Sequence, residues 1–373
     1  METNRKHFQS LASLQLIAII AVVMGHLWFC EVKMMKSLCV SFCFIYSGFF
    51  TAMFHRFDSS YGLKDHARFM WDKLSKLYPV YFLSFVIYFI SNIVWNGTYS
   101  MQSDILLAHL TLLSPWIPNA DFYYGYNAVT WFVCVLFFLY LMAPLAVRAL
   151  RQLKVTWQVL LMAALLALEF IGGYTATPES DSLWLNHYHM YQFPPMRLLD
   201  FGSGIIIYNI TTTTGWKRLQ AKLTPSLSTC IEVVGVLLFA LLYWVQRNYL
   251  FELCYRAFCI LFPAVVVLLM TFVLTSSNMG QISKILCLKP LPALSKISLE
   301  IYLLQIVVYY LFKPLFAMAG VDQMPLLYFL LQNSILIVVA WLVQRYYAKP
   351  INRLMTKAWE RCFERKRHKT QQN

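Results

Sequence analysis

Charged residues are scarce in this sequence. Asp, Glu, Lys and Arg make up 13% of the 373 residues, whereas soluble globular chains contain about 25%. No hydrophilic stretch is long enough to form a separate soluble domain, and 59% of the residues are hydrophobic. Because a soluble core cannot bury that much apolar surface, a soluble protein is excluded. The composition predicts one transmembrane domain over residues 1–350 and a basic cytoplasmic tail over residues 351–373.

Several signals of other protein classes are also missing. The sequence has no Gly-rich phosphate loop, no internal repeat and no low-complexity linker. Its nine cysteines show neither metal-ligand nor disulfide spacing, and most lie in apolar runs, where a buried thiol packs as a small hydrophobic residue. We therefore expect no bound metal. The first apolar segment lacks a small-residue cleavage site, which favours a retained helix over a secretory signal peptide.

Long apolar runs predict the fold. A hydrocarbon core about 30 Å thick is crossed by about 20 residues of helix. Backbone amides in lipid must be hydrogen-bonded within the protein, which here favours helices throughout. The predicted fold class is therefore all-α, a polytopic integral membrane bundle of about ten transmembrane helices. The predicted spans cover residues 11–29, 38–54, 78–95, 129–149, 157–174, 196–210, 230–245, 257–275, 297–318 and 326–346.

The distribution of Lys and Arg predicts the orientation of these helices. With the N-terminus in the cytoplasm, most of the 31 basic residues fall on the cytoplasmic side. The outer connections 96–128 and 175–195 contain no Lys or Arg. This asymmetry follows the positive-inside rule and places both termini in the cytoplasm. The net charge of +14 then indicates contact with anionic membrane lipid and requires no nucleic-acid partner.

Ionisable residues inside apolar spans are the candidates for function, because a charge in hydrocarbon costs at least about 2.5–3.5 kcal/mol. His26 is a possible proton acceptor near neutral pH, and a packing histidine is the alternative. Arg197 and Asp200, three residues apart, can pair on one helix face. Lys73 and Lys76 share that spacing and could hold a phosphorylated ligand, although positive-inside flanking also explains them.

Short motifs in a fixed order resemble a known family. Gln15 precedes His26 by ten apolar residues, in the position where that family carries Arg or Lys. Ser47-Gly48-Phe49 follows in the second span, and Gln305 stands where the last motif has His. The other matching residues are Lys73, Lys76, Tyr78, Pro79, Trp131, Tyr140, Pro144, Arg197, Asp200, Phe201, Gly204, Ile297, Ser298, Ile301, Tyr302 and Leu303. The chain resembles the acyltransferase-3 family of membrane O-acyltransferases.

The resemblance implies transfer of an acyl group, usually acetyl, from cytoplasmic acyl-CoA to a hydroxyl of a cell-surface glycan or lipid-linked saccharide. Acyl-CoA would be a co-substrate, with no bound cofactor, and the protein would lie in the bacterial inner membrane. His26 would be the general base. Helix rise places it about 16 Å from Gln15 and nearly on the same face. The other implied roles are donor binding by Gln15, Lys73 and Lys76, oxyanion or structural support by Ser47, Ser298, Tyr302 and Gln305, a structural or acceptor-side pair of Arg197 and Asp200, and acceptor stacking on Trp131, Tyr123 and Tyr124.

Two other functions remain as alternatives. A membrane transporter or glycan exporter would have a similar number of helices, although the internal repeats frequent in transporters are missing. A catalytically weak scaffold or sensor would agree with the neutral Gln15 in place of a basic residue. The acceptor, the length of the acyl group and the oligomeric state are open at this stage.

Overall fold

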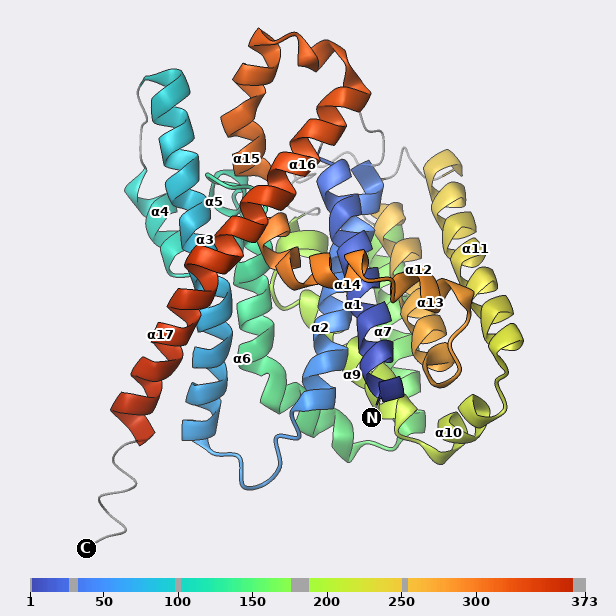
Figure 1. The fold of residues 1–373 in the computed structure, drawn as a ribbon. Helices are drawn as coiled ribbons and strands as arrows, with labels where there is room; N and C mark the ends of the chain where they lie inside the picture. The colour runs from blue at the N-terminus through green and yellow to red at the C-terminus, as the bar shows by residue number, and fades with distance from the viewer. Residues whose placement is uncertain (1, 27–32, 98–101, 176–187, 250–253, 365–373) are drawn as a thin grey trace, which may run out of the picture. The chain divides into compact units, whose positions relative to one another are not determined.

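The computed structural model describes residues 2–26, 33–97, 102–175, 188–249 and 254–364, and these form helices and turns with no β-strand among them (Figure 1). The chain divides into two compact units. The first comprises Met1–Phe57 and Met142–Ser298, and the second comprises Asp58–Leu141 and Leu299–Asn373. The helix α6, Trp131–Gln152, contributes its start to the second unit and its end to the first.

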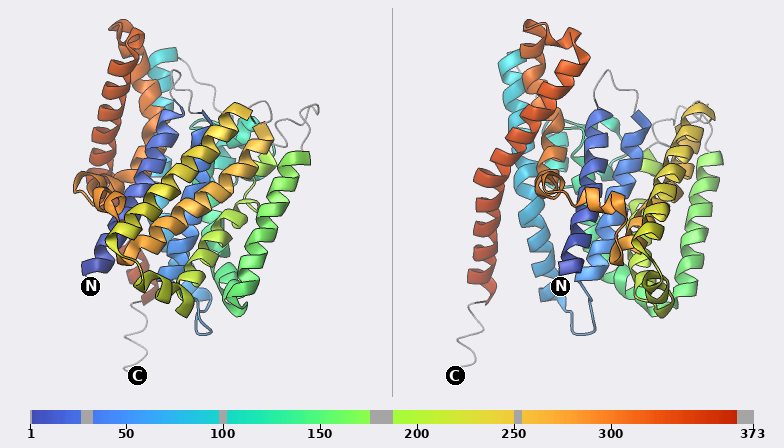
Figure 2. Two further views of the ribbon diagram at one scale, coloured as in Figure 1. Left: turned by 90° about the vertical axis from the view of Figure 1, so that its right-hand side faces the viewer. Right: turned by 45° about the vertical axis from the view of Figure 1, so that its right-hand side comes forward.

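The first unit contains most of the N-terminal and central helices. Besides the end of α6, its elements are α1 (Glu2–Met24), α2 (Lys33–Phe54), α7 (Val155–Thr175), the π-helical turn η2 (Tyr188–Gln192), α9 (Arg197–Thr211), α10 (Thr214–Ala221), α11 (Pro225–Tyr249), α12 (Cys254–Leu274), η3 (Thr275–Ser277), α13 (Gln281–Leu286), α14 (Pro290–Leu294) and η4 (Ser295–Ile297). Within this unit α11 and α12 lie side by side, as Figure 2 shows.

The second unit contains α3 and the C-terminal helices. Its elements, besides the start of α6, are α3 (Leu63–Asn96), α4 (Ser103–Leu110), η1 (Ser114–Trp116), α5 (Ala120–Tyr123), α15 (Ser298–Met318), η5 (Val321–Gln323), α16 (Pro325–Val343), η6 (Gln344–Ala348), α17 (Lys349–Trp359) and η7 (Glu360–Glu364). The last four follow one another without a break, so residue 351, the predicted start of the tail, lies within a helix.

A helix overlaps each of the ten predicted spans. Six have the length and apolar composition of a membrane span: Lys36–Phe54, Leu63–Trp95, Trp131–Gln152, Pro225–Val245, Pro290–Met318 and Pro325–Phe363. Three further apolar helices are shorter: Gln9–Met24, Val155–Leu168 and Pro263–Ser277. α9 has 15 residues, fewer than the roughly 20 that cross a bilayer. The all-α fold is confirmed for the described residues, and six helices are long and apolar enough to cross a membrane, whereas the count of ten and the cytoplasmic termini stay predictions.

Two glycines allow a close helix contact in the first unit. Gly204 of α9 lies against the backbone of Ile45 in α2, and Gly48 of α2 lies against the backbone of Phe201 in α9. Small residues allow membrane helices to approach until their backbones touch, which maximises van der Waals contact where no hydrophobic force acts between helices. Phe201 is fully buried at this contact. The two glycines therefore determine how close α2 and α9 come.

In the second unit, α3 is long and has defined ends. At its start the Asp65 carboxylate accepts a hydrogen bond of 2.9 Å from the backbone N–H of Gly62, and at its end Gly97 adopts a left-handed φ of 71°. Its first half is held by the C-terminal helix (Figures 1 and 2). The Trp71 indole donates to the carbonyl of Met355 at 2.9 Å. The predicted span 78–95 is thus only the second half of one continuous helix.

Gly204→Ala should destabilise the protein, because the added methyl group would overlap the carbonyl oxygen of Ile45. Overpacking of this kind costs about 1–3 kcal/mol. Gly202→Ala in the same helix is the matched control, since a methyl group there meets nothing within 4 Å. Thermal unfolding in detergent, followed by tryptophan fluorescence, should show a lower midpoint for Gly204→Ala only. Equal midpoints for the two variants would contradict the proposed close contact.

Candidate active site

His26 lies at the end of α1. This helix ends at Met24, and in the following turn the backbone N–H of His26 donates to the carbonyl of Val23 at 3.1 Å. The helix therefore ends before the predicted limit at residue 29, beside Gly25, a residue that favours helix ends; residues 27–29 lie outside the described part. The side chain of His26 is exposed, so it is not embedded within an apolar helix as expected.

The neighbours of α1 place His26 within the first unit. α1 packs antiparallel against α2, so the end of α1 lies beside the start of α2 (Figure 1). Gln15, the expected donor-side residue, is half-buried in the middle of α1. His26 and Gln15 thus belong to one unit, whereas Lys73 and Lys76 belong to the other.

Arg197 and Asp200 form a buried ion pair. An Nη1–H of Arg197 donates to Oδ2 of Asp200 at 2.6 Å, and the two side chains are each 3% exposed. Arg197 also donates to the Ser41 hydroxyl at 3.1 Å and to the carbonyl of Tyr191 at 2.8 Å, and its guanidinium lies 5.0 Å from the Tyr191 ring centroid. A buried pair persists when its remaining hydrogen-bonding capacity is satisfied in this way. The pair joins α9 to α2 and to the η2 turn.

Lys73 and Lys76 have different surroundings. The Lys73 ammonium lies 4.3 Å from the ring centroid of Tyr140 in α6 and 5.0 Å from that of Phe69. Such cation–π contacts stabilise a partly buried ammonium. Lys76 is exposed. The spacing predicted two ammonium groups on one face, but only Lys76 presents its charge at the surface of the unit.

The expected oxyanion donors mostly serve the protein backbone. The Ser47 hydroxyl donates to the carbonyl of Cys43 at 2.8 Å in its own helix. In the second unit, the Tyr302 hydroxyl donates to Val129 at 3.2 Å and the Gln305 amide donates to Tyr302 at 2.8 Å. Ser298, the first residue of α15, is half-buried. Three of the four groups would have to exchange a partner before they could bind a substrate.

The expected acceptor-side aromatic residues all belong to the second unit. Trp131 is buried at the start of α6, Tyr123 is buried in α5, and Tyr124 follows with its ring centroid 4.7 Å from that of Tyr123. Asn127, between these elements, donates its amide to the carbonyl of Leu303 at 2.8 Å. The start of α6 also contacts α15 through the rings of Phe132 and Tyr302, whose centroids lie 4.9 Å apart.

His109 is a buried histidine that sequence reasoning missed. It was assigned to the outer connection 96–128, but α4 runs back along α3, where the Tyr81 hydroxyl donates to the carbonyl of His109 at 2.7 Å. The ring is fully buried beside Phe85 and Tyr126, at centroid distances of 5.3 and 5.6 Å, and neither ring nitrogen has a hydrogen-bond partner in the described part of the chain. Burial lowers the pKa of His109 to about 4.

Glu232 is a second buried ionisable residue. It lies in α11, within the predicted span 230–245, and its side chain is fully buried. Its carboxylate accepts hydrogen bonds from the Thr275 hydroxyl at 3.0 Å, the Gly280 N–H at 3.0 Å, and the N–H and hydroxyl of Ser283 at 3.1 and 2.6 Å. These bonds satisfy the charge and cap the start of α13. Glu232 is thus a structural link between α11 and α13.

His109 predicts a pH dependence of stability. An unfolded histidine binds a proton near pH 6.5, whereas folded His109 does so only near pH 4. The unfolded state therefore binds more protons between these values, and stability falls as the pH decreases from 6.5 to 4, by about 3 kcal/mol in total. Thermal unfolding at pH 7 and pH 5 should show a smaller loss for His109→Gln than for the wild type. Equal losses would contradict this role for His109.

Comparisons with known proteins identify the family of the chain. The model of a family described as an acyltransferase domain matches residues 8–345. Acyltransferase MdmB from Streptomyces mycarofaciens is 26% identical over 210 residues, which cover 50% of this chain and 50% of that protein. The chain thus matches about half the length of this curated relative. No solved structure gives a significant match. Because the family model covers nearly the whole of an integral membrane chain, the protein belongs to the acyltransferase-3 family.

Proposed function

We propose that the protein is a membrane O-acyltransferase that moves an acyl group, acetyl in the simplest case, from cytoplasmic acyl-CoA to a hydroxyl of a cell-surface glycan or lipid-linked saccharide. Family membership over residues 8–345 supports acyl transfer. The apolar helices support action at a membrane, and the proposed location is the bacterial inner membrane.

The exposure of His26 carries the mechanistic part of this proposal. A general base must come within hydrogen-bond reach of the proton that it removes. His26 meets this requirement because it lies in a turn after α1, where a ligand can contact the ring without opening a helix. An imidazole also accepts and returns protons near neutral pH. A base that removes the hydroxyl proton and then protonates the leaving thiolate must do both.

The proposed reaction is direct transfer. The acceptor oxygen attacks the thioester carbonyl while His26 removes the hydroxyl proton. The tetrahedral intermediate then collapses, the carbon–sulfur bond breaks, and the leaving CoA thiolate takes the proton from the imidazolium. The products are an ester and free CoA. General-base catalysis of this kind contributes about 10²–10⁴-fold in rate.

Other residues would bind the two substrates. Gln15 can donate a hydrogen bond to the donor from the same helix as His26. On the acceptor side, the half-buried Tyr124 combines an aromatic face with a hydroxyl, a combination that suits sugar rings, whereas the ring of Tyr123 is buried. Ser298 is the proposed oxyanion donor. Its side chain is half-buried, and the hydrogen bonds described for this part of the chain include none from its hydroxyl to a backbone carbonyl.

His26→Ala should reduce acyl transfer by at least about 10²-fold, because the general base is lost. The measurement is CoA thiol released from acetyl-CoA by purified protein with a saccharide acceptor. His55→Ala is the matched control: His55 is a half-buried histidine of the same unit, stacked on Phe57 just beyond the opposite end of α2. A variant His26→Ala with near-normal rate and normal folding would remove His26 from the mechanism.

Gln15→Arg should lower the KM for acetyl-CoA and leave kcat nearly unchanged, because a positive charge in α1 would attract the anionic donor. Gln15→Leu keeps the approximate size of the side chain but removes its hydrogen-bond donor, so it should raise that KM. Initial rates at varied donor concentration measure both effects. An unchanged KM in both variants would place Gln15 away from the donor.

A further inference from the structure

An open cavity of about 570 Å³ lies beside the first part of α1. It is bounded by Gln9 and Ala12 of α1 and by the segment from Cys287 to Lys296, which includes α14 and η4. All these residues belong to the first unit, the one that carries His26. Its volume lies in the range of ligand-binding clefts, roughly 300–1,000 Å³. The cavity is therefore large enough for a nucleotide-sized ligand.

The polar groups that line the cavity suit an anion. Two lysines, Lys289 and Lys296, contribute ammonium groups, Gln9 contributes an amide and Ser295 a hydroxyl, and none of the lining residues is acidic. Ammonium groups form strong, charge-assisted hydrogen bonds with phosphate oxygens. The remaining lining is apolar, as expected where a ligand passes from water toward lipid. The chemical class that fits is a phosphate-bearing molecule with an apolar or weakly polar extension.

The position along α1 connects the cavity to His26. The apolar part of α1 begins at Gln9, which lines the cavity, and ends at Met24, just before His26. The helix rise between Gln9 and His26 is about 25 Å. Ala12 at the cavity and Gln15 are three residues apart, so they are neighbours on the surface of α1. A ligand whose phosphates occupy the cavity would therefore lie next to Gln15, on the helix that ends just before His26.

We infer that this cavity, with Lys289 and Lys296 as its cations, binds the phosphate groups of the acyl donor. The identity of the occupant rests on the proposed function, since CoA joins its phosphates to its thioester through a long flexible arm. A phospholipid headgroup offers the same phosphate chemistry at a membrane boundary. The two sources differ in the rest of the molecule, and this difference is what the test uses.

Cys287 provides a site-resolved test in the unmodified protein. Its thiol is half-buried and lines the cavity, whereas Cys230 of the same unit and Cys362 of the other are exposed. Purified full-length protein in uncharged detergent is treated with N-ethylmaleimide, and mass spectrometry measures the rate at each cysteine. Desulfo-coenzyme A, which keeps the phosphates but has no thiol, is the probe. At tenfold its dissociation constant it should slow the reaction of Cys287 about tenfold, because roughly a tenth of the sites remain free.

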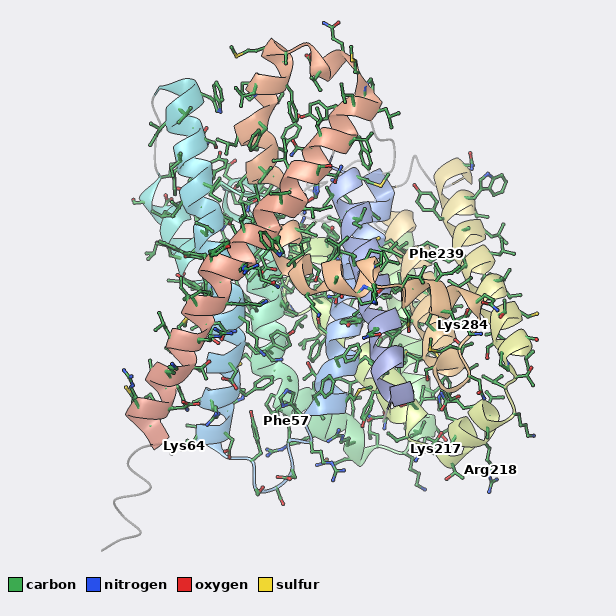
Figure 3. The ribbon with its side chains drawn as sticks, viewed as in Figure 1. Phe57, Lys64, Lys217, Arg218, Phe239 and Lys284 are labelled. Carbon is green, nitrogen blue, oxygen red and sulfur yellow. The ribbon has the colours of Figure 1, made fainter. Side chains whose placement is uncertain are left out.

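Lysine variants test the cations. In the double variant Lys289→Ala, Lys296→Ala, half protection of Cys287 should need about tenfold or more desulfo-coenzyme A. Each lost charge-assisted hydrogen bond contributes more binding free energy than a neutral hydrogen bond. Lys284→Ala is the control: Lys284 is exposed on α13, as Figure 3 shows, but it does not line the cavity. Equal losses in the control and the double variant would indicate a general surface-charge effect and overturn the cavity as the site.

Experiments in lipid nanodiscs distinguish the two sources of phosphate. The same alkylation is followed in nanodiscs of phosphatidylcholine with and without phosphatidylglycerol. Protection of Cys287 by desulfo-coenzyme A supports the donor site. Protection by phosphatidylglycerol alone overturns the donor as occupant, and protection by neither overturns the phosphate site. None of these readouts needs acyl transfer, so loss of the proposed enzymatic function would leave the binding result intact.

Discussion

A charged pair buried within a membrane protein must have its hydrogen bonds satisfied, and this constraint sets the arrangement of the first unit. Arg197 and Asp200 neutralise each other, and the guanidinium reaches Ser41 of α2. That contact forms in one register of α9 against α2, the register in which Gly204 lies on the α2 backbone. Because α1 packs on α2, the same register also determines where the end of α1, with His26, lies within this unit.

The lengths of the apolar runs predicted the helices because hydropathy is encoded locally. The end of α1 was missed because the sequence stays apolar through residue 29, so hydropathy has no signal at Met24. The packing of α4, within the connection 96–128, against α3 was not predicted for another reason. α4 turns back along α3 through hydrogen bonds such as that from Tyr78 to the carbonyl of Leu110, at 3.0 Å, and such a contact between distant residues leaves no periodic pattern.

For the site residues, too, features that are local in sequence were predictable and features that depend on distant residues were not. The spacing of Arg197 and Asp200 predicted their pairing, because that spacing is local. Motif order could not show that Tyr140 of α6 packs on the Lys73 ammonium, because that ring comes from another helix. It also could not show that Gly280 and Ser283, about fifty residues beyond Glu232, bury and bind its carboxylate. Each of these outcomes depends on a partner that is distant in sequence, so side-chain environments were less predictable than side-chain identities.

The two histidines show what a catalytic base needs in this fold. His109 is enclosed by aromatic rings, and burial keeps it neutral down to a pH of about 4, but no substrate reaches it without displacing α4 from α3. His26 is exposed at a helix end, so its chemistry depends on how a ligand is brought there. Under the proposed donor binding, a ligand held by charge near Gln9 would lose orientational freedom in the cavity, and this would raise the effective concentration of its thioester within the first unit.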